Sequence, residues 1–335
     1  MNSVASSSST APQPVGSLRL HALVFVTNYA PNVVELAAWS NPDCRVILIG
    51  LSRYRHQLTA PNIDFVDLEP LVEATRREGF DDDYVFAAVS SQDWAMFTVR
   101  RWLVLSRHLA TLTLPPGAAI AHFDADVLLF EAVAERWRWL SEAQVASDGA
   151  WVMKSGFSLL SPTVVHRFAA FIRHVYALPQ PKLETLMWRF GMPTRLPRNL
   201  PAKKRERLKP WLIRNETLTI FNDNELVDAF RISSARGELA AGMRARWTMG
   251  AVRPDCVPIK FARQFYAKDG SSSLAWRGRR PYAPLLNGTL QPVCFIHYGG
   301  PLKNELMQQT IAHWQRTADE GGGAGNSEER QLSTE

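Results

Sequence analysis

The chain has 335 residues, of which 46% are hydrophobic, so it is long enough to bury a large core. Its formal net charge of +6 suits phosphate-bearing ligands or an anionic membrane surface without proving either. The three cysteines (Cys44, Cys256 and Cys294) offer no disulfide framework and no zinc spacing, so we expect a reducing compartment. We also expect no membrane-spanning segment and no secretory signal, because no apolar run approaches the required length.

The first half of the chain alternates between predicted strands and predicted helices. Residues 1–17 are rich in Ser, Ala and Pro and are predicted to be a disordered tail. Strands are then predicted over 18–27, 45–50, 63–68 and 118–123, and helices over 31–39, 70–77 and 93–109. Such alternation is typical of a mostly parallel central sheet flanked by helices on both faces. We therefore expect a single large α/β domain over residues 18–316.

The second half of the chain is less regular. A strand is predicted over 151–160, followed by a helix over 162–177. Residues 180–210 are rich in Pro and basic side chains and receive no predicted element. A short helix over 223–231 and a late strand over 293–296 follow, and the Gly-rich residues 317–335 are predicted to be a second disordered tail.

Two carboxylates, Asp124 and Asp126, directly follow the apolar run 118–123. In parallel sheets ligands bind beyond the carboxyl ends of the strands, and Thr27 and Asn28 end the first predicted strand at the same edge. Paired acids at such a place need a cation, a proton or a substrate. Hard cations such as Mg²⁺ and Mn²⁺ prefer carboxylate oxygens. The alternative is a turn in which the two acids cap the next helix.

A second acidic triplet, Asp81-Asp82-Asp83, has no predicted strand before it. We interpret it as a solvated turn or as the start of a helix. It is therefore not a candidate metal site.

The strand, Asp124-Ala125-Asp126 and the apolar residues 127–130 together resemble the metal-binding motif of glycosyltransferases with the GT-A fold. The resemblance implies that Asp124 and Asp126 hold Mn²⁺ or Mg²⁺ on the diphosphate of a nucleotide sugar, a UDP-sugar in the leading interpretation. The same residues also resemble the nucleophile motif of haloacid-dehalogenase-type phosphotransferases, with Asp124 as nucleophile and Asp126 as acid/base. That motif normally opens its domain, whereas a strand–helix array precedes it here.

An arginine pair, Arg100-Arg101, lies on the predicted helix upstream of the acids. A basic residue at this place is typical of the GT-A family, and the resemblance implies that one of the two, assigned to Arg101, contacts the donor. The alternative is a surface arginine pair.

A second motif, His297, Gly300 and Lys303, follows the late strand with the spacing His-x-x-Gly-x-x-Lys. It resembles the C-terminal motif of retaining GT-A enzymes of the glycogenin and bacterial galactosyltransferase type. The resemblance implies that His297 is the third metal ligand, that Gly300 lets the backbone approach the diphosphate, and that Lys303 neutralises it. The family motif usually continues with Pro-Trp, and this chain departs from it there. Without the resemblance, a hydrogen-bonded core histidine is the simpler interpretation.

Two weaker features fit the same family. Ser155 and Gly156 resemble the segment that faces the donor sugar and acceptor, although a plain core strand with a glycine bulge is an alternative. Asp223 resembles the acidic residue that positions sugar hydroxyls in these enzymes. Alternatively, Asn222 or Asp223 caps a helix, and these two roles of Asp223 do not exclude each other.

A basic stretch lies within residues 198–209. Its members are Arg198, Lys203, Lys204, Arg205, Arg207 and Lys209. Such a run is either a solvated face or an interfacial patch for anionic lipid or a phosphorylated acceptor. No nucleic-acid motif accompanies it, so we expect no nucleic-acid partner.

The sequence thus predicts a metal-dependent glycosyltransferase that acts with retention on a glycan, lipid-linked or protein acceptor. We expect it in the cytoplasm, at the membrane face. A protein that binds nucleotide sugars on the same scaffold without turnover is the remaining alternative.

Overall fold

The structure is a computed structural model of the whole chain. It describes residues 19–28, 32–130, 133, 149–153, 157–240, 243, 246–248, 257–259, 273–285, 288–298 and 303–321. Both predicted tails, apart from residues 317–321, lie outside these ranges. No helix in the described part of the chain is both long enough and apolar enough to cross a membrane.

A seven-stranded sheet forms the centre of the fold, with the order β11-β6-β7-β4-β1-β2-β3. Its strands are β1 (Arg19–Val26), β2 (Val46–Gly50), β3 (Ile63–Asp67), β4 (Ala118–Phe123), β6 (Gly149–Met153), β7 (Phe157–Leu160) and β11 (Arg246–Thr248). Four neighbouring pairs are parallel, and β7 is antiparallel to both β4 and β6. The mostly parallel sheet is therefore confirmed. The single strand predicted over 151–160 is wrong, because this segment forms two antiparallel strands.

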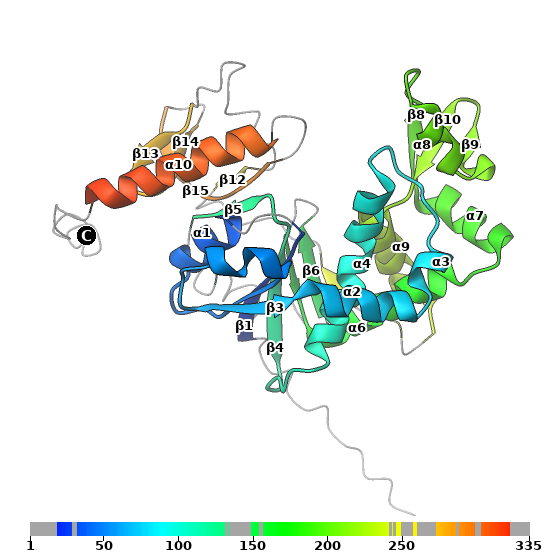
Figure 1. Cartoon of the computed structure of the whole chain (residues 1–335), viewed down its shortest axis with the longest axis horizontal. Helices are drawn as coiled ribbons and strands as arrows, with labels where there is room; N and C mark the ends of the chain where they lie inside the picture. Colours follow the sequence, from blue (N-terminus) through cyan, green and yellow to red (C-terminus); the bar gives the residue numbers. More distant parts are fainter. Residues whose placement is uncertain are drawn as a thin grey trace, which may run out of the picture.

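Helices cover both faces of the sheet (Figure 1). They are α1 (Asn32–Ser40), α2 (Leu68–Arg77), α3 (Phe80–Asp83), α4 (Gln92–Leu109), α6 (Pro162–Tyr176), α7 (Gln180–Phe190), α8 (Ala202–Arg207), α9 (Asp223–Ala235) and α10 (Lys303–Gly321), with 3₁₀ turns η1 (Ser52–Gln57) and η2 (Pro210–Leu212). Side chains of α2, α4, α6 and α9 build one buried cluster, and those of α1, β5, β15 and α10 build the other. Strand β4 feeds both, because Ile120 joins the first cluster while Ala121 and Phe123 join the second. The predicted α/β class is confirmed.

Two smaller sheets flank the central one. Strands β12 (Val257–Ile259), β13 (Ala275–Arg277), β14 (Arg280–Pro284) and β15 (Leu290–His297) form one of them, and β5 (Val127–Leu129) pairs with β15. Strands β8 (Met192–Arg195), β9 (Ile213–Arg214) and β10 (Thr217–Ile220) form the other. In Figure 1 these two sheets lie at opposite ends of the molecule, one beside α10 and the other beside α7 and α8. The segment 180–210, for which we predicted no element, thus contains two helices and a strand.

The cysteines differ from expectation. Cys294, on β15, is disulfide-bonded, whereas Cys44 is a free and buried thiol. The prediction of reduced cysteines is therefore wrong for Cys294. Disulfides persist mainly in oxidising compartments.

Candidate metal and donor site

Asp124 and Asp126 reach the carboxyl edge of the sheet because β4 ends immediately before them. Strand β4 is fully buried and runs parallel to β1, with Phe25 beside Phe123 in the register. The same register brings Thr27 and Asn28, which follow β1, to this edge. The amide of Val127 donates to the Asp124 carbonyl over 3.1 Å, and the resulting tight turn carries the chain from β4 into β5.

His297 is brought to the two acids by the pairing of β5 with β15. The two strands are antiparallel, with His297 opposite Val127, and the amide of Tyr298 donates to the Asp126 carbonyl over 2.8 Å. This register leaves the His297 Nε2 atom 3.4 Å from Asp126 Oδ1. Residues far apart in the sequence therefore become neighbours through a backbone ladder, which fixes their relative position more firmly than a loop contact would.

The three side chains Asp124, Asp126 and His297 form a compact ligand set. One ligand atom from each lies within 4.8 Å of the others, and all three side chains are half-buried. Within the described residues this is the one group of three or more His, Cys, Asp or Glu side chains so arranged. Two carboxylates and an imidazole are a donor set that Mn²⁺ accepts readily and Mg²⁺ accepts through its oxygens. The ligand set predicted from the sequence is thus brought together.

Arg101, on α4, lies between Asp124 and a third acid, Asp223. Its guanidinium is ion-paired with Asp124, and its second terminal nitrogen lies 2.5 Å from Asp223 Oδ2. Burial acts to lower the pKa of Arg101, but the two carboxylates outweigh it and raise that pKa. For the Asp223 carboxyl, burial raises the pKa, and the nearby charge of Arg101 opposes this effect. A shared buried cation therefore couples Asp223 to the metal-ligand set.

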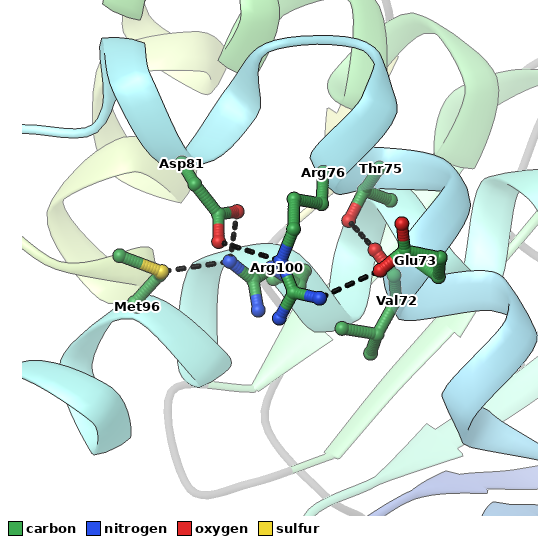
Figure 2. Close-up of polar contacts among 7 residues, drawn as sticks. All are labelled: Val72, Glu73, Thr75, Arg76, Asp81, Met96 and Arg100. Carbon is green, nitrogen blue, oxygen red and sulfur yellow. Dashed lines mark hydrogen bonds and ion pairs between the residues drawn. The ribbon is translucent and has the colours of Figure 1, made fainter.

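The neighbouring arginine has a different role. Arg100 points away from the site and is ion-paired with Asp81 of α3, beside Met96 and Arg76 (Figure 2). Its guanidinium also lies 5.6 Å from the centroid of the Phe80 ring. Asp81 does lie in a helix start, as one interpretation held, but it is the partner of a buried arginine. The side chains of successive helix residues point about 100° apart, so Arg101 faces Asp124 while Arg100 faces Asp81.

Asp223 is positioned by the start of α9. Asn222 is the N-cap: its side chain accepts from the Asn224 amide over 2.9 Å, and its own amide donates to Glu225 Oε2 over 3.0 Å. This capping box holds Asp223 as the first helical residue, with 6% of its surface exposed. Asn222, and not Asp223, is therefore the cap, and the carboxylate of Asp223 is left available to Arg101.

Some of the remaining predicted site residues lie in the described part of the chain and others do not. Thr27 is buried, and the buried Asn28 Oδ1 atom has no hydrogen-bond donor among the described residues. Ser155, Gly156 and Gly300 lie outside the described residues. Ala125 separates the two acids. Lys303 is the first residue of α10.

Sequence reasoning missed two phenols behind Asp223. Burial, followed by the charge of Asp223, raises the pKa of Tyr84, and burial raises that of Tyr176. Their ring centroids are 5.3 Å apart, and neither hydroxyl has a hydrogen-bond partner within the described part of the chain. No sequence pattern marks these residues, because they come from a loop and from the end of α6.

Known proteins similar to this chain were found only by structure. No family model and no curated protein matches its sequence. Mouse xyloside xylosyltransferase 1 matches 69% of this chain with 85% of its own, at 10% identity and a TM-score of 0.39. The match to an active-site mutant of LgtC covers 92% of this chain and 99% of that chain, at 15% identity and a TM-score of 0.41. The match to the glycosyltransferase GlyE of Streptococcus pneumoniae covers 66% of this chain and 49% of that chain, at 13% identity and a TM-score of 0.26. At these values the similarities carry no weight in the functional argument, which depends on the site itself.

Proposed function

We propose that this protein is a metal-dependent glycosyltransferase that moves a sugar from a UDP-sugar to an acceptor hydroxyl. The observation that carries the proposal is the Asp124, Asp126 and His297 ligand set at the carboxyl edge of a mostly parallel sheet. Carboxylates and an imidazole in one compact group suit a divalent cation shared with substrate phosphates. The resemblance of both motifs to GT-A enzymes supports the same activity.

We assign Mn²⁺, or Mg²⁺ in its place, to Asp124, Asp126 and His297. When bound there, the cation supplies positive charge that offsets the charge developing on the leaving diphosphate. The half-buried ligand set favours this role, because water screens charges less at such a site. Arg101, already ion-paired with Asp124, adds a fixed cation at the same edge.

The donor is proposed to lie along the edge formed by the ends of β1, β4 and β15. Thr27 and Asn28 contribute polar groups after β1, and Asn28 Oδ1, which has no donor among the described residues, can accept a hydrogen bond from a hydroxyl or amide of the nucleotide. Gly300 and Lys303 are assigned to the diphosphate by their motif. Ser155 and Gly156 are assigned to the donor sugar in the same way, together with the backbone at Ala125.

Asp223 is the acid that we assign to the sugar. It is held by Arg101 at 2.5 Å and by the α9 capping box, so its carboxylate has a fixed position. A fixed carboxylate can orient sugar hydroxyls or stabilise positive charge at the anomeric carbon. We propose retention at that carbon, as the His297 motif suggests, with the leaving phosphate taking the acceptor proton.

The acceptor is proposed to be a glycan, a lipid-linked sugar or a protein. The basic patch (Arg198, Lys203, Lys204, Arg205, Arg207 and Lys209) supports work at an anionic membrane surface. Of its six cations, five are exposed, and none forms an ion pair with the described residues. A cytoplasmic location remains a prediction from the sequence, and the disulfide of Cys294 favours an oxidising compartment instead.

Of the two alternatives, the phosphotransferase is less consistent with the site. Strands β1 to β3 precede Asp124, and β1 is its direct neighbour, whereas a haloacid-dehalogenase-type nucleophile opens its domain. In addition, such a nucleophile needs no histidine ligand from β15. A binding protein without turnover differs from the proposal in activity alone, so only an assay of transfer separates the two.

The test measures UDP release and sugar transfer from a panel of UDP-sugars to glycan acceptors, with Mn²⁺ present or with excess EDTA. Wild type should release UDP only with the metal, and Asp126→Ala and His297→Ala should lose at least a hundredfold in rate while remaining folded. Asp82→Ala and His56→Ala are matched controls on exposed side chains and should keep full rate. Full activity of either site variant, or activity in EDTA, would refute the proposal. Phosphoaspartate trapped at Asp124 would favour the phosphotransferase.

A further inference from the structure

A groove lies between α1, the end of η1 and α10, outside the residues assigned to the donor site. Its volume is about 560 Å³, within the roughly 300–1,000 Å³ typical of small-molecule sites. Helices α1 and α10 contact each other, and both contribute side chains to the same buried cluster, while α10 lies beside the sheet of β13, β14 and β15 (Figure 1). We propose that this groove binds an uncharged saccharide chain.

The aromatic feature of the groove is Trp39. Its side chain is 49% exposed, and within the described part of the chain it is the one aromatic residue in the exposed class. A half-exposed indole keeps part of its apolar surface in water, and a ligand that covers this surface removes it from water. The flat face of an indole matches the C–H face of a pyranose ring in shape and polarity, so a sugar can cover this surface.

The charged side chains of the groove are already engaged. Glu35 accepts hydrogen bonds from the amide of Thr59 over 2.6 Å and from its hydroxyl over 3.0 Å, so it holds the segment after η1 against α1. The guanidinium of Arg279 lies 4.8 Å from the centroid of the Trp314 ring. The groove thus contains one carboxylate and one guanidinium that keeps its charge while it lies over Trp314, so these two side chains give it no excess of either charge.

The polar side chains left in the groove are amides. Asn32, Gln57 and Gln315 line it, and each amide carries both a donor and an acceptor, with the Asn32 amide also donating to Gln308 Oε1 over 3.5 Å. Sugar hydroxyls also donate and accept, so amides pair with them without any net charge. An exposed indole beside several amides therefore favours a neutral, hydroxyl-rich ligand over a lipid, a nucleotide or an acidic peptide.

The floor of the groove is rigid. Leu36, Ile311 and Trp314 are buried in the cluster shared by α1 and α10, so the walls do not have to form on binding. The groove begins at Asn32, the first residue of α1, which follows the end of β1. If the saccharide is the acceptor or product of transfer, that identity rests on the proposed function. The binding itself does not.

The test uses the full chain without metal or donor and measures binding of neutral hexasaccharides of glucose, galactose or N-acetylglucosamine by calorimetry. At least one should bind with millimolar or better affinity. Trp39→Ala should weaken that binding at least tenfold, and Trp39→Phe should weaken it less because a ring remains. Met192→Ala, at a comparably exposed side chain on β8, is the matched control and should bind as wild type does.

The outcomes separate this proposal from the proposed function. Asp126→Ala should bind the hexasaccharide normally, since the donor site takes no part, whereas Trp39→Ala should keep Mn²⁺ binding. No binding to any of the hexasaccharides, or equal binding by wild type and Trp39→Ala, overturns the groove proposal. Loss of binding in Asp126→Ala alone would move the saccharide to the donor site and overturn it as well. Saccharide binding without any transferase activity would refute only the proposed function.

Discussion

Arg101→Met tests whether one cation holds the site together. The Arg101 side chain is 12% exposed, and its partners Asp124 and Asp223 are 27% and 8% exposed. Removing one partner of a buried ion pair typically costs about 3–5 kcal/mol, because the remaining charge is left uncompensated. Met keeps much of the apolar stem, so the loss is mainly electrostatic. We expect the free energy of unfolding at neutral pH to fall by that amount, measured by urea denaturation with circular dichroism.

The pH dependence of this loss has a defined sign. Burial raises the pKa of Asp223 even with Arg101 present, and removing the cation should raise it further. A carboxyl whose folded-state pKa is raised favours the folded state at low pH and loses that contribution as pH rises through the raised pKa. The difference between Arg101→Met and wild type should therefore be largest at neutral pH and shrink on acidification. Arg198→Met, at an exposed arginine that has no ion pair with the described residues, should show no such difference.

Two further measurements complete the test. Mn²⁺ should stabilise Arg101→Met more than wild type, because Asp124 then gains a cation. Adding Asp223→Asn to Arg101→Met should cost less than the sum of the two single variants, because the second change removes an unpaired charge. An unchanged urea midpoint at neutral pH, or a loss that does not vary with pH, would refute this account of Arg101.

Three other predictions follow from the same geometry. Arg100→Met should lower the free energy of unfolding by about 1.5–3 kcal/mol through the loss of its Asp81 pair, yet leave Mn²⁺ affinity in calorimetry unchanged. Asp223→Asn should weaken Mn²⁺ binding severalfold, since Arg101 then pairs with Asp124 alone; equal or tighter binding would contradict the coupling. Reduction of the Cys294 disulfide should lower stability by about 2–4 kcal/mol, and thiol titration in denaturant should count more thiols after reduction than before it.

Local patterns in the sequence were sufficient to predict much of the sheet and the position of the two acids at its edge, whereas His297 was added by the family resemblance. The apolar run of β4 and the acids after it predicted the carboxyl edge, and α4 was predicted to within one residue of its start because its periodicity is strong. The capping residues around Asn222 predicted the start of α9. In each case neighbouring residues carry the whole signal.

The errors arose where tertiary contacts decide the outcome. The reversal between β6 and β7 cannot be read from an alternating apolar pattern, since the pattern is the same for one strand or two. The assignment of Arg101 instead of Arg100 came from the family resemblance and was no error, but no local rule shows which side of α4 faces the sheet edge. The Arg101–Asp223 pair joins elements that no local rule connects, and so does the contact between Tyr84 and Tyr176. Short strands such as β9 carry too few residues to show any period.

The ladder between β5 and β15 has a consequence for biosynthesis. Strand β5 leaves the ribosome long before β15, so its edge has no β15 partner until most of the chain has been made. The cation site therefore cannot be assembled on a nascent chain that has not yet reached His297. If the proposed cation site is correct, metal affinity should appear only in a chain that extends through His297.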